Sequence, residues 1–164
     1  VDPTVATTTF AATEFLYTGN NPIQTGVTAG TIDPKRAAVL RGRVLDKQNN
    51  PLSGVTLTVL NHPEFGQTLS RADGWFDLVV NGGGYLTLNY QKTGYLPAQR
   101  QANVPWQDYV IAPEAILILQ DSQVTTVDLT ANVPMQVARG SVQTDVDCAR
   151  HPTLLFPQGT QATM

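Results

Sequence analysis

The sequence predicts an all-β protein centred on a sandwich or barrel of short strands. Three observations support this. Short runs rich in valine, leucine and threonine begin at Ala38, each bounded by turn residues. Within them apolar and polar residues alternate, so that "GVTLTVL" places Val55, Leu57 and Val59 on one face and threonines on the other. No stretch carries the apolar period of a helix of useful length.

The predicted strands follow one another through most of the chain. They are AVLRGRVLD (38–46), GVTLTVLN (54–61), QTLSR (67–71), WFDLVV (75–80), YLTLNYQK (85–92), AQRQANV (98–104), AILILQ (115–120) and QVTTVDLT (123–130). Fully burying one large apolar side chain contributes on the order of 1.5 to 3 kcal/mol. The positions predicted to form the core by alternation are Val55, Leu57, Val59, Phe76, Leu78, Val80, Leu86, Leu88 and Tyr90.

The turn residues agree with these strands. "NNPLSG" joins the first two runs, with Pro51 fixing its backbone and Gly54 free to adopt a left-handed conformation. Asp73–Gly74 in "ADGW" predicts a tight hairpin turn, and the glycines 82–84 predict a second hairpin. The glycine and prolines spread over 94–113 favour irregular connections or edge positions.

We expect three segments. Residues 1–37 mix threonine, alanine, glycine and proline without a sustained period, which predicts an extended lead that is ordered only against another surface. Residues 38–120 form the β-sandwich, and residues 121–164 begin a second β module. The first residue is valine and the last strand has no obvious closing element, so we expect a piece of a longer polypeptide.

The composition excludes several functional classes. Only 14% of residues are charged and the net charge is −3, so there is no basic stripe for nucleic acid. No apolar run is long enough for insertion into a membrane. The single cysteine, Cys148, cannot form a disulfide within the chain. The low charge predicts a surface of hydroxyl and amide groups that is partly covered by other protein.

Four titratable residues lie close together in "NHPEFGQTLSRADGWFDL": His62, Glu64, Asp73 and Asp77. A metal or acid/base site can have this appearance, yet no second histidine stands at ligand spacing. Asp73 suits the turn beside Gly74, Asp77 falls on the outward face of its strand, and Glu64 is expected to be solvated. The sequence therefore predicts structural roles here, with no metal and no cofactor.

Other motifs also favour structural interpretations. Cys148 and His151 have the residue types of a nucleophile and a base, but no helix is present to activate the thiol. Asp145 and Asp147 lack the glycine and the downstream acidic ligand of a calcium loop. The glycines 82–84 are followed by a strand, whereas a phosphate loop needs a helix. A platform for sugars remains an alternative, formed by Trp75, Tyr85, Tyr95, Trp106 and Tyr109.

The runs "LRGRVLDKQNNPLSGVTLTVL", "SRADGWFDL" and "KTGYLP" resemble the carboxypeptidase regulatory-like domain, a transthyretin-like or Ig-like β-sandwich of about seven strands. The resemblance covers residues 38–120. It implies that the matching positions define turns and fold and carry no catalysis: Gly42, Pro51, Gly54, Asp73, Gly74, Phe76, Gly94 and Tyr95.

Two stretches narrow this resemblance. "LNHPEFGQTLSRADGWFDLVVNGGG" and "NVPWQDY" look like the version found in teneurins and bacterial RHS or YD-repeat proteins, and residues 121–164 are similar to the plug domain that follows there. The resemblance implies a secreted or cell-envelope, non-enzymatic module that packs on or plugs a β-shell enclosing a C-terminal toxin segment. Its partner would be the rest of its own polypeptide. The candidate interface residues are Phe65, Trp75, Trp106 and Tyr109.

Two alternatives remain open at this point. One is a carbohydrate-binding or cell-adhesion sandwich, with a glycan or cell-surface protein as its partner. The other is an accessory domain of a carboxypeptidase-type enzyme, which requires a zinc peptidase domain directly upstream.

Overall fold

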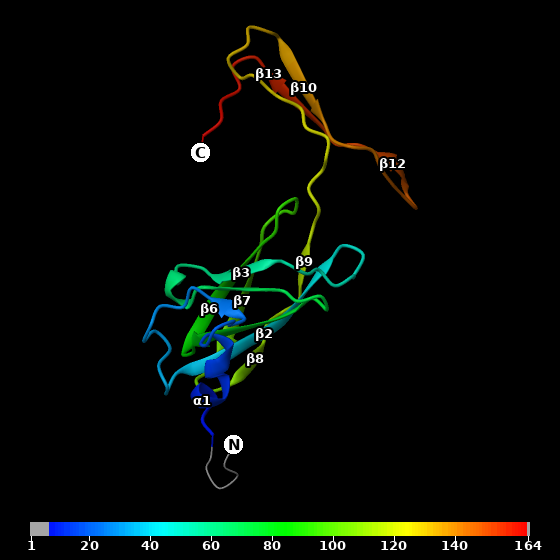
Figure 1. Ribbon diagram of the computed structural model, residues 1–164. Coiled ribbons are helices and arrows are strands. Elements are labelled where there is room, and N and C mark those ends of the chain that lie inside the picture. The colour runs from blue at the N-terminus through cyan, green and yellow to red at the C-terminus, as the bar shows by residue number, and fades with distance from the viewer. Residues whose placement is uncertain (1–6, 164) are drawn as a thin grey trace. The chain divides into compact units, whose positions relative to one another are not determined.

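The computed structural model describes residues 7–163. The chain divides after Leu119 into two compact units (Figure 1). The elements of the first unit are α1 (Thr9–Thr13), η1 (Glu14–Leu16), β1 (Gln24–Thr25), β2 (Ala37–Asp46), β3 (Thr56–Val59), η2 (Pro63–Phe65), β4 (Gln67–Leu69), β5 (Trp75–Asn81), β6 (Gly84–Gln91), β7 (Ala98–Val104), β8 (Tyr109–Ile111) and β9 (Ala115–Leu117).

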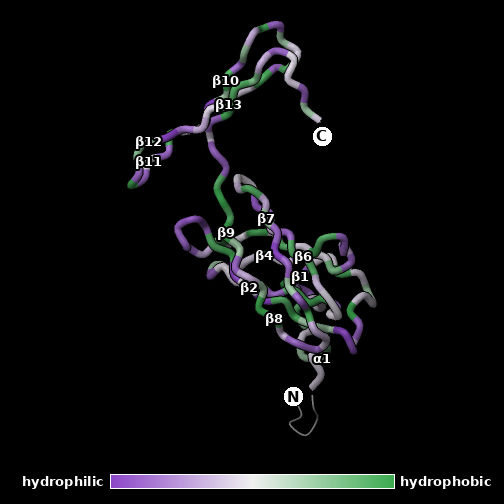
Figure 2. The backbone as a smooth tube through the Cα atoms, turned by 180° about the vertical axis from the view of Figure 1, so that it is seen from behind, coloured by the Kyte–Doolittle hydropathy of each residue, from purple (hydrophilic) through white to green (hydrophobic). Residues whose placement is uncertain are grey.

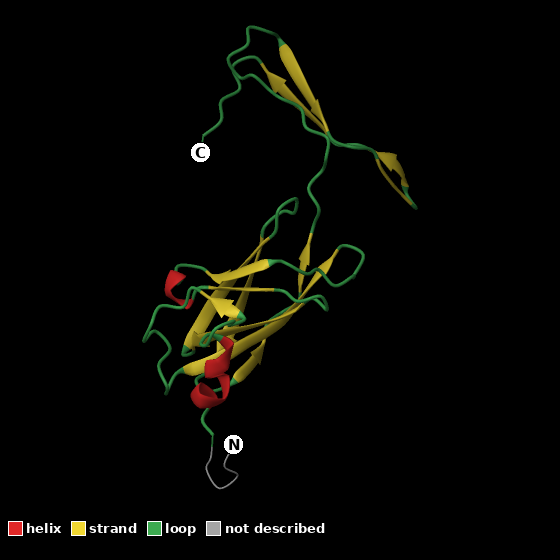
Figure 3. Cartoon of the chain, viewed as in Figure 1, coloured by secondary structure: helices red, strands yellow, loops and turns green. Residues whose placement is uncertain are grey.

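The first unit is a β-sandwich, which confirms the predicted fold class. One sheet has five strands in the order β1-β4-β3-β6-β7, and its strand pairs are antiparallel. The other sheet has the order β5-β2-β8, and β9 extends it by pairing with the end of β2. In this second sheet β5 is antiparallel to β2, whereas β8 and β9 run parallel to it. Figure 3 shows the strands of both sheets in one colour.

The core lies between the inner faces of the two sheets, and it contains the side chains that the alternation of apolar and polar residues predicted. The predicted core positions are buried, except that Leu86 is half-buried. At the centre the rings of Phe76 and Tyr90 meet edge to face, with centroids 5.9 Å apart. Gly42 of β2 leaves space for the Phe76 ring, because a Cβ there would lie 2.7 Å from it.

Several turns join strands of different sheets. Asp73–Gly74 forms the predicted tight turn, closed by a bond from the Arg71 amide to the Trp75 carbonyl, but it leads from β4 in one sheet to β5 in the other. The glycines between β5 and β6 likewise cross between sheets. Both hairpin predictions were therefore wrong, because a turn signal identifies a chain reversal and does not identify the strand that pairs next.

The described part of the N-terminal lead packs on the sandwich. Thr8 caps α1 by accepting a bond from the Ala11 amide, α1 contacts β2, and η1 contacts β5. Leu16 and Ile32 join the core cluster, and β1 pairs with β4. Figure 1 shows α1 beside the lower part of β2. Residues 1–6 and 164 lie outside the described residues.

The second unit contains two separate two-stranded sheets. One pairs β10 (Met135–Arg139) with β13 (Thr153–Pro157), and the other pairs β11 (Gln143–Asp145) with β12 (Cys148–Arg150). The strand predicted over 123–130 is absent from this part of the described chain. Its alternating valines and threonines have strand propensity, yet no described neighbour pairs with them. Between residues 7 and 163, no helix is long and apolar enough to cross a bilayer.

Candidate functional site

The "HPEFG" stretch forms the corner between β3 and β4. Pro63 begins the short helix η2, and the His62 Nδ1 lies 2.9 Å from the Glu64 Oε1. The His62 ring stacks on Phe65, with centroids 5.3 Å apart. The Glu64 carboxylate is therefore bonded to His62 while 39% of its side chain stays exposed to solvent, and this bond lowers the pKa of the carboxyl.

The N-terminal lead crosses the chain at this corner. The Thr28 amide donates to the Glu64 carbonyl at 3.0 Å. Gly66 has φ +64°, and a Cβ there would lie 2.0 Å from the Thr25 carbonyl oxygen. Glycine is needed at position 66 for both reasons, because it tolerates the left-handed backbone and leaves space for the crossing segment.

Gln24 of the lead joins this corner to β5, an edge strand of the other sheet. Its side chain is fully buried. The Nε2 donates to the carbonyls of Phe65 (2.7 Å) and Val79 (2.9 Å), and the Oε1 accepts from the Val79 amide (2.7 Å). The amide thus satisfies both backbone groups of Val79, as a neighbouring strand would. We call Gln24, Phe65, Gly66 and Val79 the lead clasp.

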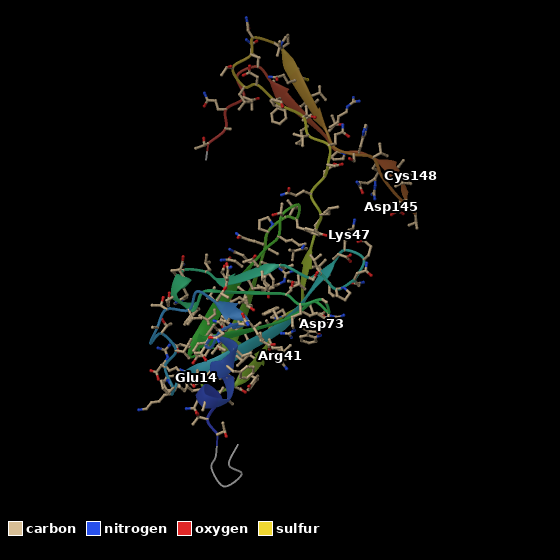
Figure 4. The ribbon with its side chains drawn as sticks, in the orientation of Figure 1. Glu14, Arg41, Lys47, Asp73, Asp145 and Cys148 are labelled. Atoms are coloured by element: carbon tan, nitrogen blue, oxygen red, sulfur yellow. The ribbon has the colours of Figure 1, made fainter. Side chains whose placement is uncertain are left out.

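An ion-pair cluster covers the outer face of β5. The Asp77 side chain is only 5% exposed; its Oδ1 accepts from Arg41 Nε at 2.5 Å and its Oδ2 from Arg71 Nη1 at 2.7 Å. Asp77 faces outward as predicted, but the arginines bury it. Burial raises the pKa of Asp77, and the bonds from Arg41 and Arg71 outweigh that effect and lower it. Figure 4 labels Arg41 on β2 and Asp73 in the turn before β5.

The turn around Asp73 and Gly74 contacts strand β2 and the turn at Pro51. The Asp73 Oδ1 accepts from the Trp75 amide at 3.0 Å. Gly74 has φ +79°, and a Cβ there would lie 2.5 Å from the Val44 carbonyl and 3.3 Å from Pro51. This close approach brings together the "NNPLSG" and "ADGW" turns.

Gly54, Gly94 and Tyr95 do not take part in the close approach at Gly74. The Gly54 amide donates to the Ser70 carbonyl at 2.8 Å, and its φ is +65°. Gly94 has φ +83° with open space around it, while Tyr95 is half-buried and packs against the core. These residues occupy reversals at several places, and no shared site forms from them.

The candidate aromatic interface residues do not form one surface. Phe65 is 3% exposed and belongs to the core, so its ring is not available to a partner. Trp75 and Tyr109 flank opposite sides of β2, beside Arg43 and Val39 respectively. Trp106 is 58% exposed and lies against Gly83, beyond the far end of β5 from Trp75. A single platform containing both tryptophans therefore does not form.

The titratable residues do not converge on one centre. His62 pairs with Glu64, the Asp73 carboxylate accepts from the Trp75 amide in its own turn, and Asp77 binds arginines. The part of the chain that the structure describes contains no group of three potential metal ligands from histidine, cysteine, aspartate and glutamate. In the second unit Cys148 is exposed and lies opposite Asp145 in the β11–β12 pair, and the Asp145 carboxylate pairs with Arg150.

Sequence reasoning missed three residues that organise the site. Gln24 lies in "NNPIQTG", where no pattern distinguishes it. Arg71 reaches Asp77 only because of the intervening turn. Ser70 is buried between loops, accepting from the Val55 amide and donating to the Leu52 carbonyl. Only the opposite charges of Arg41 and Asp77 could have indicated part of the site from the sequence. The two residues are neighbours because they stand opposite each other in the antiparallel pairing of β2 with β5.

Residues 32–117 match the family model described as the teneurin TTR-like domain. The chain belongs to the teneurin TTR-like domain family. Teneurin-m from Drosophila melanogaster is 34% identical over 128 residues, which cover 78% of this chain and 5% of that protein. Mouse teneurin-3 is 34% identical over 97 residues, or 59% and 4%. The chain thus spans about one-twentieth of the length of these teneurins. The resemblance to a plug domain over 121–164 stays a prediction.

Solved structures show a more distant likeness. The TIE protein of Bacillus anthracis has a TM-score of 0.44 at 14% identity, covering 74% of this chain and 27% of that chain. The minor pilin GBS52 of Streptococcus agalactiae has a TM-score of 0.43 at 10% identity, covering 57% and 49%. At these scores the likeness says nothing about the chemistry of the teneurin TTR-like domain.

Proposed function

We propose that this chain is a non-catalytic structural module of a larger, exported teneurin-like YD-repeat protein, and that it packs on or plugs the β-shell enclosing a C-terminal segment. Membership of the teneurin TTR-like family supports the parent protein. The contacts of the lead clasp and of Asp77 fit a stabilised scaffold, in which a buried amide and a buried carboxylate are bonded to partners within the fold.

One observation carries the packing part of the proposal. β10 and β13 form a two-stranded hairpin whose long connection carries β11 and β12, and this β10–β13 hairpin has exposed apolar side chains on both of its faces. Val137 pairs with Leu155 on one face, and Ala138 pairs with Leu154 on the other. Val137, Leu154 and Leu155 are 44%, 62% and 56% exposed. An isolated two-stranded hairpin is marginally stable in water and needs further strands or a covering surface. The rest of the parent polypeptide would supply both.

Hydrogen exchange on the parent protein tests this. Amides of 135–139 and 153–157 should exchange slowly in the parent and fast in the isolated chain, because docking stabilises the hairpin. Replacing both Val137 and Leu155 by asparagine in the parent should abolish that protection. The matched control is Val124→Asn, at an exposed valine outside the hairpin.

Two results would contradict the proposal. Equal exchange of the hairpin in the parent and in the isolated chain would show that nothing docks on it. Full protection in the doubly substituted parent would show that its apolar side chains do not make the contact.

A further inference from the structure

The outer face of the five-stranded sheet carries a continuous set of neutral side chains. We call the outward-facing residues of β6 and β7 the amide face: Thr87, Asn89, Gln91, Gln99, Gln101 and Asn103. Strand pairing sets them side by side, with Thr87 opposite Gln101 and Asn89 opposite Gln99. The charged residue of β7, Arg100, has the opposite orientation and donates to the Glu114 carbonyl. The amide face therefore carries no charge.

Most of its amide groups are free to bind. Gln99 Nε2 donates to Asn89 Oδ1 at 2.7 Å. Within residues 7–163, the side chains of Gln91, Gln101 and Asn103 form no hydrogen bond, and all three are exposed. Each free amide offers two donors and a carbonyl acceptor. The amide face thus presents hydrogen-bond donors and acceptors at the regular spacing of residues along and between strands.

The surface at the end of this face is hollowed. One depression of about 440 Å³ is lined by Asn89, Gln91, Pro97 and Gln99. A second, also about 440 Å³, is lined by Thr56, Gln91 and Pro97 together with Lys92. The two share Gln91 and Pro97, so they adjoin. At the other end of the face Tyr85, 70% exposed, pairs with Asn103.

The chemistry of the face selects among ligand classes. Phosphate polymers need a basic groove with several cations. The amide face itself carries none, and Lys92, beside the depression at Gln91, donates to the Ser53 carbonyl. The cores of protein interfaces are rich in aromatic and apolar side chains, whereas the amide face has neither and Tyr85 stands at its edge. An uncharged oligosaccharide matches the face, because its hydroxyls donate and accept like the amides and its ring faces stack on tyrosine.

We propose that the amide face, with Tyr85 at its edge, binds an uncharged oligosaccharide lying across β6 and β7. This inference does not rest on the proposed packing function, since it uses the first unit alone. Ligand rings would contact Tyr85, and the amides of Gln101 and Asn103 would bond the hydroxyls that follow. The depressions at Gln91 would hold the other end.

Titration of the whole chain with neutral hexasaccharides of glucose, mannose and N-acetylglucosamine, followed by NMR shifts of the side-chain amides, tests the proposal. At least one sugar should shift the amides of Gln91, Gln101 and Asn103. Tyr85→Ala and Gln101→Ala should each weaken that binding about tenfold, a loss of about 1.4 kcal/mol. Both side chains point away from the core, so the fold should be unaffected.

The control is Tyr109→Ala, which removes a tyrosine of similar exposure on the other sheet and should leave the affinity unchanged. The proposal fails if no neutral sugar shifts these amides at millimolar concentration. It also fails if Tyr109→Ala weakens binding as much as Tyr85→Ala, or if only an oligogalacturonate, which is anionic, binds.

Discussion

The two sheets of the sandwich differ in how their outer faces are covered. On the sheet of β5, β2 and β8, the outward-facing Val39, Asp77 and Val79 are buried beneath the N-terminal lead and two arginine side chains. On the five-stranded sheet, the amide face stays open and neutral. Figure 2 colours each residue along the strands of both sheets by its hydropathy. Alternation thus fixes the inner face of a strand, while remote segments decide whether its outer face meets water.

Gly66→Ala should cause the largest loss of stability, because it disturbs the packing of the N-terminal lead on the sandwich. The new methyl group would overlap the Thr25 carbonyl, and alanine would be strained at φ +64°. We expect a loss of about 4 kcal/mol in the free energy of unfolding, measured with urea. Gly94→Ala is the matched control, since φ is +83° in open space there and strain alone costs about 1 kcal/mol. Equal losses in the two variants would contradict the crossing of the lead at Gly66.

Gln24→Met tests whether the amide holds the lead to β5. Methionine has a similar shape but leaves the Val79 amide and two buried carbonyls without partners. The expected loss is about 3 kcal/mol, together with faster hydrogen exchange at the Val79 amide. Gln67→Met, at an exposed glutamine, should change little. If the Val79 amide stays equally protected in Gln24→Met, another group satisfies it.

Asp77→Asn addresses the ion-pair cluster and its pH dependence. Because the pKa of Asp77 is lower in the folded chain, its stabilisation is complete above the unfolded value of about 3.9 and is lost as pH falls through the folded pKa. We expect the variant to be about 2 kcal/mol less stable near neutral pH. The difference in the free energy of unfolding between the unsubstituted chain and Asp77→Asn should decrease toward roughly pH 3. An equal difference in stability at neutral pH and at the acidic pH would show that the charge of Asp77 does not stabilise the outer face of β5.

Tyr90→Phe examines the core between the two sheets. The Tyr90 hydroxyl is buried and bonds to none of the described residues, and burial raises the pKa of the phenol. Removing it keeps the ring contact with Phe76 and relieves an unsatisfied group. Thermal unfolding should show a gain of up to about 1 kcal/mol. A loss of similar size would mean that the hydroxyl has a partner, such as a buried water.

The smallest effect is expected on the open sheet. Gln101 is exposed and its amide bonds to none of the residues between 7 and 163, so Gln101→Ala should change stability by less than about 0.5 kcal/mol. Denaturation in urea with the sugar absent would measure this. A loss as large as that of Asp77→Asn would mean that the outer faces do not differ as described.

The inner faces of the strands were predictable because alternation is a local property. The run 98–104 coincides with β7, and Val55, Leu57 and Phe76 are buried as their patterns indicate. Edge positions near the prolines were also foreseen, since β8 lies at a sheet edge. The assignment of strands to sheets was not predictable, because the same turn residues serve hairpins and crossings.

The covering of the outer face could not be read from local patterns. The lead has no period, and its fit depends on Gln24 meeting Phe65 and Val79, which are 41 and 55 residues away. Asp77 was assigned to the right face, but its burial depends on Arg71, which a turn delivers. Trp75 and Trp106 were both candidate interface residues by sequence, and only the arrangement of the strands shows that they lie in different places.

The clasp at Gln24 also limits how this protein can associate. An edge strand with unpaired backbone groups is a template onto which another chain can add, and it is a common origin of aggregation. At Val79 those groups are already occupied by a side chain of the same molecule. At this position of β5, a side-chain amide thus occupies the place that the backbone of an added strand would take.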